Sequence, residues 1–195
     1  MSAKRKPKVD LLEAALDLVA RKGWSGYSAL ELAAETGIGL AEACTQLGDR
    51  TAILDAMGRR ADMAMIDLAP EELLELSRQE RVFELLMRRF DGLKPARPAL
   101  RALRGEAAPD AWLQGLGNLR RAIKLVVEAA GLPAQGPRAV LLGAALANAY
   151  LRTGRVWLDD DSEDQAATLA ALDSNLGRMA NFLRDPASDH AAAAG

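Results

Sequence analysis

The chain has 195 residues and 50% of them are hydrophobic, so it can bury a sizeable core. Aromatic residues make up only 4%, whereas alanine, leucine, glutamate and arginine are abundant, and this composition favours helices over strands. A formal net charge of −2 excludes a globally basic nucleic-acid-binding protein, so any DNA contact must come from a local patch. One cysteine and one histidine exclude a disulfide framework and a Cys/His metal site within one chain. We therefore expect an all-α protein without a cofactor.

The N-terminal segment is basic and is predicted to be a flexible cationic arm. Its basic residues are Lys4, Arg5, Lys6 and Lys8. It lacks the apolar region of a secretory signal, and no stretch of the chain approaches the ~18 uninterrupted apolar residues that a membrane span needs. We expect a cytoplasmic protein without a membrane span.

Apolar spacing and breaks predict helices in the first third of the chain over residues 9–22, 28–36, 40–47 and 50–68. Ser28 and Glu31 form a capping box at the start of the second helix, and Gly37 permits the left-handed turn that ends it. Asp49 can cap the fourth helix, which Pro70 interrupts.

Beyond Pro70, further helices are predicted over residues 77–93, 96–104, 109–130, 137–158 and 162–183, about nine in all. Capping boxes mark the starts at Ser77 and Ser162, and the acidic run 159–161 is interpreted as a solvated helix start. We expect a three-helix helix-turn-helix unit with its arm at 1–57, a larger helical ligand-binding and dimerisation domain at 58–185, and a disordered tail at 186–195.

Several residues between Leu11 and Met57 match a known helix-turn-helix pattern. They are Gly23-Trp24 after the first helix, Leu32-Ala33 in the second, Gly37-Ile38 in the turn, and Asp49-Arg50 with Ile53 after the third. The segment resembles the DNA-binding domain of TetR-family transcriptional regulators. The resemblance implies a homodimer that binds a palindromic operator in double-stranded DNA, with a repressor role that a small hydrophobic ligand relieves.

A glycine-containing turn between two short helices also has a direct physical reading, because it sets a crossing that lets the second helix enter a major groove. An ordinary helical hairpin fits the same spacing. The third helix departs from the family at Ala43-Cys44 and Leu47, and its one charge is Glu42. The predicted DNA-contacting residues are Lys4, Arg5, Lys6, Lys8, Lys22, Ser28, Arg50 and Arg59, with Thr45 and Gln46 reading bases.

An alternative function comes from the C-terminal region. Residues 138–179, with Tyr150, Trp157, an acidic turn and a long final helix, are similar to the TetR-like lipid-binding proteins of ubiquinone biosynthesis. That resemblance implies an isoprenoid-binding accessory protein that does not read DNA.

Apolar residues recur at alternating spacings of three and four along the last predicted helix, which favours packing against a partner helix. Small residues on the preceding predicted helix allow the two helices to approach closely. The predicted dimer interface is Ala144, Ala147, Leu169, Leu172, Leu176 and Met179. Both faces could instead be satisfied inside one monomer.

An apolar ligand pocket is predicted in the same domain, although such residues can also form solid core. Its predicted lining is Phe83, Leu86, Met87, Phe90, Trp112, Leu116, Leu119, Ile123, Val127 and Tyr150. No phosphate-binding loop, nucleophile elbow or metal-ligand helix is present in the sequence, and His190 lies in the predicted tail, so we do not expect an enzyme.

Overall fold

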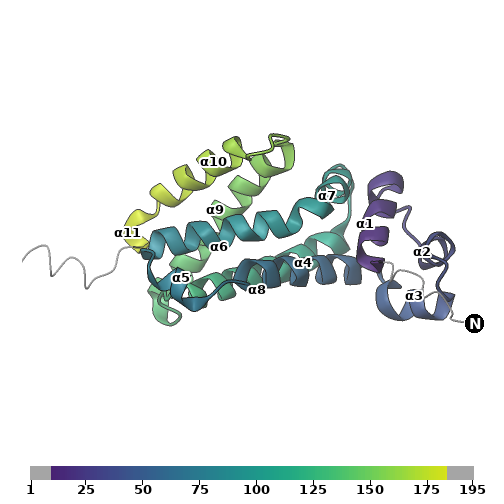
Figure 1. Cartoon of the computed structure of the whole chain (residues 1–195), viewed down its shortest axis with the longest axis horizontal. Helices are drawn as coiled ribbons and strands as arrows, with labels where there is room; N and C mark the ends of the chain where they lie inside the picture. The colour runs from purple at the N-terminus through teal and green to yellow at the C-terminus, as the bar shows by residue number, and fades with distance from the viewer. Residues whose placement is uncertain (1–9, 184–195) are drawn as a thin grey trace, which may run out of the picture. The chain divides into compact units, whose positions relative to one another are not determined.

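The computed structural model describes residues 10–183, and every regular element in that range is a helix (Figure 1). The elements are α1 (Leu11–Lys22), α2 (Ala29–Thr36), α3 (Leu40–Leu47), α4 (Arg50–Ile66), α5 (Pro70–Leu74), α6 (Arg78–Leu93), the 3-10 turn η1 (Lys94–Ala96), α7 (Arg97–Arg104), α8 (Pro109–Ala129), α9 (Gly136–Asp159), α10 (Ala166–Gly177) and α11 (Ala180–Leu183). The all-α prediction is confirmed. The predicted arm and the predicted tail at 186–195 lie outside the described residues. Of the helices between residues 10 and 183, none has the length and hydropathy that crossing a bilayer requires.

Local side-chain chemistry explains where the first helices start and stop. The Asp10 side chain accepts hydrogen bonds from the backbone N–H groups at the start of α1, and Gly23 ends that helix with φ +80°. The Ser28 hydroxyl accepts from the Glu31 N–H at 3.2 Å and so caps α2. The reciprocal half of a capping box is not formed there, because the Glu31 carboxylate pairs with Lys22. The predicted capping box at Ser77 is confirmed: its N–H donates to the Glu80 carboxylate at 2.8 Å, and its hydroxyl accepts from the Glu80 N–H at 3.3 Å.

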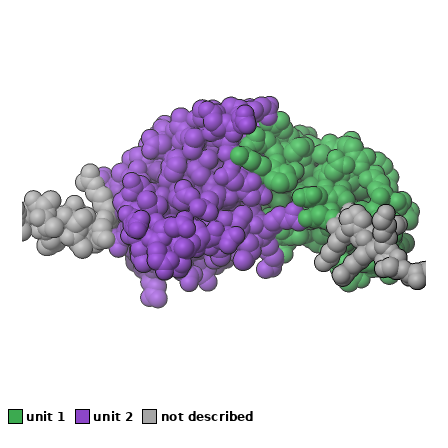
Figure 2. Space-filling model, viewed as in Figure 1, with its two compact units in different colours: residues 1–58, 94–115 green, residues 59–93, 116–195 purple. Residues whose placement is uncertain are grey.

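The described chain divides into two compact units, which Figure 2 shows in green and purple. Unit 1 contains the helices up to Gly58 together with Lys94–Gly115, and unit 2 contains Arg59–Leu93 and the chain from Leu116 onward. From the sequence, the segment 94–115 is predicted to belong to the domain at 58–185. In the structure it clusters with the first three helices, because α7 packs directly on α1.

The core of unit 1 is built by apolar side chains from α1 to α4 and α7. Its most buried members include Leu18, Trp24, Leu32 and Ile53, and Ala99 closes it from α7. Burial of these side chains supplies the main stabilisation of the unit.

The core of unit 2 lies where α6, α9 and α10 pack together. It contains an ion pair, because Arg89 Nε donates to Asp62 Oδ1 at 2.9 Å and both side chains are buried. The Arg89 guanidinium also lies 5.0 Å from the centre of the Tyr150 ring and donates to the Tyr150 hydroxyl. The desolvation cost of burying both charges offsets much of their attraction, so the pair contributes little net stability.

The predicted start of the last long helix is wrong. α10 begins at Ala166, its N-cap Gln165 makes no side-chain capping bond, and Ser162 does not cap a helix. Asp160 fills this role instead: its buried carboxylate accepts from the Thr168 N–H at 2.8 Å and the Thr168 hydroxyl at 2.6 Å. The acidic run 159–161 is therefore not simply a solvated helix start, because Asp160 ties the loop to α10.

Candidate nucleic-acid interface

The α2–turn–α3 segment has the geometry that a helix-turn-helix requires. Gly37 ends α2 in the left-handed region with φ +70°, and its N–H donates to the Ala33 carbonyl at 2.9 Å. Gly39 has ordinary extended backbone and directly precedes α3. The chain therefore reverses over residues 37–39, and α3 packs against α2.

Two buried side chains and one tyrosine fix α3 within unit 1. Ala43 and Leu47 point into the core, and the Tyr27 hydroxyl donates to the Leu47 carbonyl at 2.5 Å. This bond satisfies a carbonyl at the C-terminal end of α3, where intrahelical partners run out. Burial raises the pKa of Tyr27, and the nearby Cys44 adds to this shift, so the phenol stays a neutral donor at physiological pH.

The opposite face of α3 is exposed. It carries Leu40, Ala41, Glu42, Cys44, Thr45 and Gln46. The Thr45 hydroxyl donates to the Ala41 carbonyl at 2.8 Å, and the Gln46 amide donates to Glu42 at 3.1 Å. The two predicted base-reading residues are thus on the accessible side of the helix, and Gln46 must release Glu42 if both its amide hydrogens are to reach a base.

The basic residues at the end of α1 already have acidic partners. Lys22 Nζ lies 2.5 Å from Glu31 Oε1, and Arg21 pairs with Asp17 and Glu35 at 2.9 and 2.7 Å. The hydrogen bonds that Arg21 donates to Glu35 and then to Asp17 raise the pKa of Arg21. A phosphate would therefore have to compete with Glu31 for Lys22.

Arg50, a predicted phosphate ligand, is held inside unit 1. Its guanidinium lies 5.7 Å from the centre of the Trp24 ring, donates to the Trp24 carbonyl at 3.4 Å, and pairs with Asp110 at 3.5 Å. Ser28 is similarly occupied as the cap of α2. Arg59 is exposed and belongs to unit 2, and the predicted arm residues lie outside the described range.

Sequence analysis missed two carboxylates that hold the loop after α1. Glu106 accepts from the Trp24 N–H at 2.6 Å, the Ser25 N–H at 3.1 Å and the Ser25 hydroxyl at 2.9 Å, which lowers its pKa. Asp110 accepts from the Trp24 indole N–H at 3.2 Å. The only local signal was that a buried indole N–H needs an acceptor. Nothing local identifies that acceptor, because it lies more than 80 residues away.

Comparison with solved structures identifies the fold. No family model matches the sequence, and no curated protein matches it. The crystal structure of the TetR transcriptional regulator from Nitrosomonas europaea ATCC 19718 aligns with a TM-score of 0.70 at 25% identity, over 87% of this chain and 95% of that chain. A TetR transcriptional regulator from Rhodococcus sp. RHA1 aligns with a TM-score of 0.53 at 22% identity, over 85% of this chain and 92% of that one. The chain has the TetR fold. The resemblance read from residues 11–57 is thereby confirmed at the level of the fold.

Within this TetR fold, the residues of the predicted pocket are partly core residues and partly exposed. Leu86 and Phe90 are core residues of unit 2, and the Phe90 ring stacks on Tyr150 with ring centres 4.9 Å apart. Trp112 and Leu116 are exposed on α8, at 70% and 54%. The remaining predicted lining residues are buried or half-buried: Phe83, Met87, Leu119, Ile123 and Val127.

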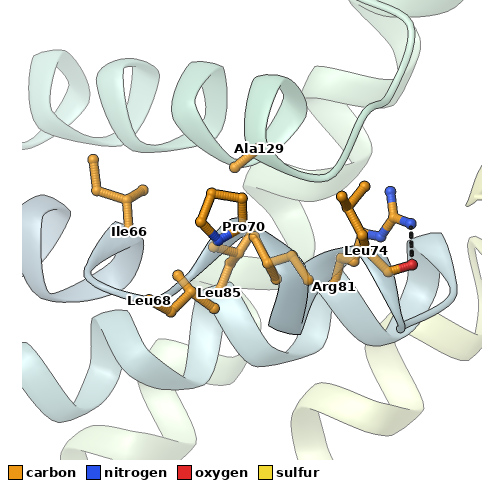
Figure 3. Close-up of a pocket in the computed structure, with 8 residues that line it drawn as sticks. Ile66, Leu68, Pro70, Leu74, Arg81, Leu85 and Ala129 are labelled. Atoms are coloured by element: carbon orange, nitrogen blue, oxygen red, sulfur yellow. Dashed lines mark hydrogen bonds between the residues drawn. The ribbon is translucent and has the colours of Figure 1, made fainter.

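An apolar cavity of about 290 Å³ lies in unit 2 where α5 meets α6 and the ends of α4 and α8 (Figure 3). Aliphatic side chains line it: Ile66, Leu68, Pro70, Leu73, Leu74, Leu85 and Ala129. Arg81 is its one charged lining residue, and its guanidinium donates to the carbonyls of Leu76 and Leu74 at 2.9 and 3.2 Å. α5 was not predicted, because Pro70 was interpreted as a break although proline is well tolerated in the first turn of a helix.

The predicted dimer residues separate into two groups in the TetR fold. Leu172 and Leu176 are fully buried in the monomer and Met179 is nearly so, whereas Leu169 and Ala144 are exposed and Ala147 is half-buried. The apolar face of α10 therefore finds its partner helices within unit 2, in α9 and α6.

Proposed function

We propose that the chain is a transcriptional regulator that binds operator DNA through α3. One observation carries this proposal: the exposed face of α3 is held rigidly by Ala43 and Leu47 within a helix-turn-helix of a TetR fold. A second helix fixed in this way can present side chains to the edges of bases in a major groove. The two solved structures compared above are both described as TetR transcriptional regulators, which supports the same function.

The charges around α3 determine what kind of DNA binding to expect. The exposed face carries one charge, Glu42, and Lys22 is paired with Glu31. Most of the affinity then has to come from phosphate contacts elsewhere, with the basic residues 4–8 as the best candidates. We expect steep salt dependence and modest sequence selectivity.

Selection from random DNA duplexes at physiological salt, with the full chain, tests this function. A palindromic sequence should be enriched, and Gln46→Ala should weaken preference at one base pair of each half-site by about 1–3 kcal/mol. Gln79→Ala, the same substitution on α6, is the matched control and should leave the preference unchanged. Equal binding to all duplexes by the wild type and Gln46→Ala would contradict base reading by α3.

The isoprenoid-binding alternative is not adopted, because the two solved structures compared above are described as regulators. The selection also tests this choice. No enriched duplex, together with an isoprenoid lipid that copurifies with the chain, would reverse it.

The regulator is proposed to act as a homodimer through α9 and α10. Val140, Ala144 and Leu151 form an exposed strip on α9, and Ala166 and Ala170 give α10 an exposed face of small side chains. Such faces permit close helix approach around a two-fold axis. A dimer would present two copies of α3 to successive major grooves, ~34 Å apart.

A small hydrophobic ligand is proposed to relieve repression by binding the cavity lined by Leu68, Leu85 and Ala129. Its volume of about 290 Å³ and its aliphatic lining favour a compact apolar molecule. Ala129→Phe should fill the cavity, abolish binding of hydrophobic fluorescent probes and leave DNA binding intact. Ala134→Phe, at an exposed loop position, is the control. Unchanged probe binding in Ala129→Phe would assign the ligand site elsewhere.

A further inference from the structure

A second cavity of about 290 Å³ opens as a groove between α9 and the segment formed by α10 and α11. These helices lie side by side within unit 2 (Figure 1). Four polar side chains line the groove: Asn148 and Arg152 from α9, and Asn175 and Arg178 from the α10 side. Its remaining lining is apolar, contributed by Ala145, Ala149, Met179 and Phe182. None of these residues lines the cavity proposed above for the hydrophobic ligand.

Hydrogen bonds within the groove occupy the side-chain oxygens of its two asparagines and use only some of the N–H donors of its two arginines. Arg152 Nε donates to Asn148 Oδ1 at 3.3 Å, and Arg178 Nη1 donates to Asn175 Oδ1 at 3.4 Å. The Asn175 amide donates in turn to the hydroxyl of buried Thr153 at 3.1 Å, which fixes the orientation of that asparagine. Each guanidinium has five N–H donors, so most of the donor capacity remains for a ligand that offers acceptors.

The groove is also positively charged. Neither Arg152 nor Arg178 forms an ion pair with a carboxylate of residues 10–183, unlike Arg21 and Arg88, which both do. Asp173 is the one acidic residue in the sequence of α10, and it does not line the groove. Two guanidinium groups without carboxylate partners on one concave surface favour a planar or tetrahedral oxyanion.

We propose that this groove binds the anionic head of a small amphiphile, a phosphate monoester or carboxylate joined to an apolar group. The two arginines hold the oxyanion, and Met179 and Phe182 contact the apolar part. A nucleic-acid backbone would leave this apolar surface unused. The residues of α9 and α10 proposed above for the dimer face do not line the groove, and a two-fold interface centred on the groove would set the same arginines near one another. This ligand site is distinct from the function proposed above and does not depend on it.

Titration calorimetry of the full chain with monomeric octyl phosphate tests the proposal. Octyl glucoside supplies the same apolar group without the charge, and inorganic phosphate supplies the charge without the apolar group. We expect saturable binding of octyl phosphate, and binding at least about tenfold weaker for either comparison compound, since both parts of the groove contribute.

Substitutions then locate the site. Arg152→Gln and Arg178→Gln should each weaken octyl phosphate binding about tenfold, because each removes charge-assisted hydrogen bonds. Arg155→Gln is the matched control, since it removes the same charge from α9 at a position outside the groove lining. Circular dichroism confirms that the variants are folded. Equal effects of Arg152→Gln and Arg155→Gln would overturn the proposal in favour of diffuse charge attraction.

Two further experiments identify the source of the anionic head group and test whether a second copy of the chain occupies the groove. Binding of phosphatidylcholine vesicles only when they contain phosphatidic acid, lost in Arg152→Gln, assigns the head group to a membrane lipid. Binding of free octyl phosphate without binding of the vesicles assigns the head group to a soluble amphiphile. If Arg152→Gln instead converts a dimer to a monomer in sedimentation and leaves octyl phosphate binding unchanged, the groove belongs to an interface between copies and the proposal fails.

Discussion

The hydroxyl of Tyr27 connects the loop after α1 to the last carbonyl of α3, that of Leu47. Both groups are buried, so neither can exchange this bond for one with water without local opening. The position of α3 therefore depends on a residue outside the two helices of the helix-turn-helix.

We predict that Tyr27→Phe lowers the free energy of unfolding by about 1–3 kcal/mol, because the buried Leu47 carbonyl loses its donor while the ring remains. Urea denaturation measures this change. The m-value should stay constant, since the surface exposed on unfolding is the same. A change below about 0.5 kcal/mol would mean that another donor or water reaches the carbonyl.

A second residue, Asp160, makes stability depend on pH. Hydrogen bonds from Ser162 and then Thr168 hold its pKa well below the usual value of a carboxyl group. A depressed pKa in the folded state stabilises the fold above the pKa of the unfolded chain, and this contribution is lost as pH falls through the folded-state pKa.

We predict that wild-type stability falls more steeply below about pH 4 than that of Asp160→Asn, which lacks the titrating group. At neutral pH the variant should be less stable, because an amide cannot accept all the hydrogen bonds of the carboxylate. Urea denaturation across this pH range provides the measurement, with Asp173→Asn as the exposed control in the same unit. Parallel pH profiles for the wild type and Asp160→Asn would exclude Asp160 as the source.

At the scale of elements, the turn between α2 and α3 contains a matched pair of glycines. A Cβ added at either Gly37 or Gly39 meets open space, but only Gly37 has a positive φ, +70°. The two positions therefore separate backbone strain from steric clash.

We predict that Gly37→Ala destabilises the fold by about 1 kcal/mol, because an L-residue is strained in the left-handed region. Gly37→Asn should cost less, since asparagine tolerates that region. Gly39→Ala should lie within about 0.5 kcal/mol of the wild type. Thermal unfolding of the three variants provides the comparison, and equal effects at positions 37 and 39 would argue against strain.

The sequence predicts best the helices whose ends are marked by residues close to them in the chain. The bounds of α3 were predicted as observed, and capping motifs at Ser28 and Ser77 placed α2 and α6 to within a residue. The start of α10 was not predictable, because the same motif at Ser162 is overridden by Asp160, whose carboxylate reaches Thr168 across the loop. A capping motif predicts a helix start only where no stronger nearby acceptor competes.

At the scale of the whole molecule, the signals that were missed are long-range. Glu106 and Asp110 join Lys94–Gly115 to the rest of unit 1 through contacts with Trp24, and no pattern along the chain records that pairing. The apolar lining predicted around Phe90 had the composition of a pocket. Whether such side chains enclose space or fill it depends on packing, which periodicity does not specify.

Packing also decides which residues can be used to test the dimer proposed above. Leu172 and Leu176 are buried in the monomer, so charges there would unfold the chain rather than separate subunits. We predict that Val140→Glu combined with Leu151→Glu gives a folded monomer, because both side chains are exposed on α9, at 72% and 49%. Sedimentation measures the association state. Leu113→Glu on α8 is an equally exposed control, and an unchanged dimer in the double variant would place the interface elsewhere.

The exposed side chain of Cys44 gives the chain a built-in reporter. It lies on the face of α3 proposed to meet DNA, and it is the only cysteine in the sequence. A maleimide reagent therefore labels this one position in the unaltered chain. Bound operator should slow the alkylation, and an inducing ligand should restore its rate, so the occupancy of α3 can be followed as the kinetics of a single thiol.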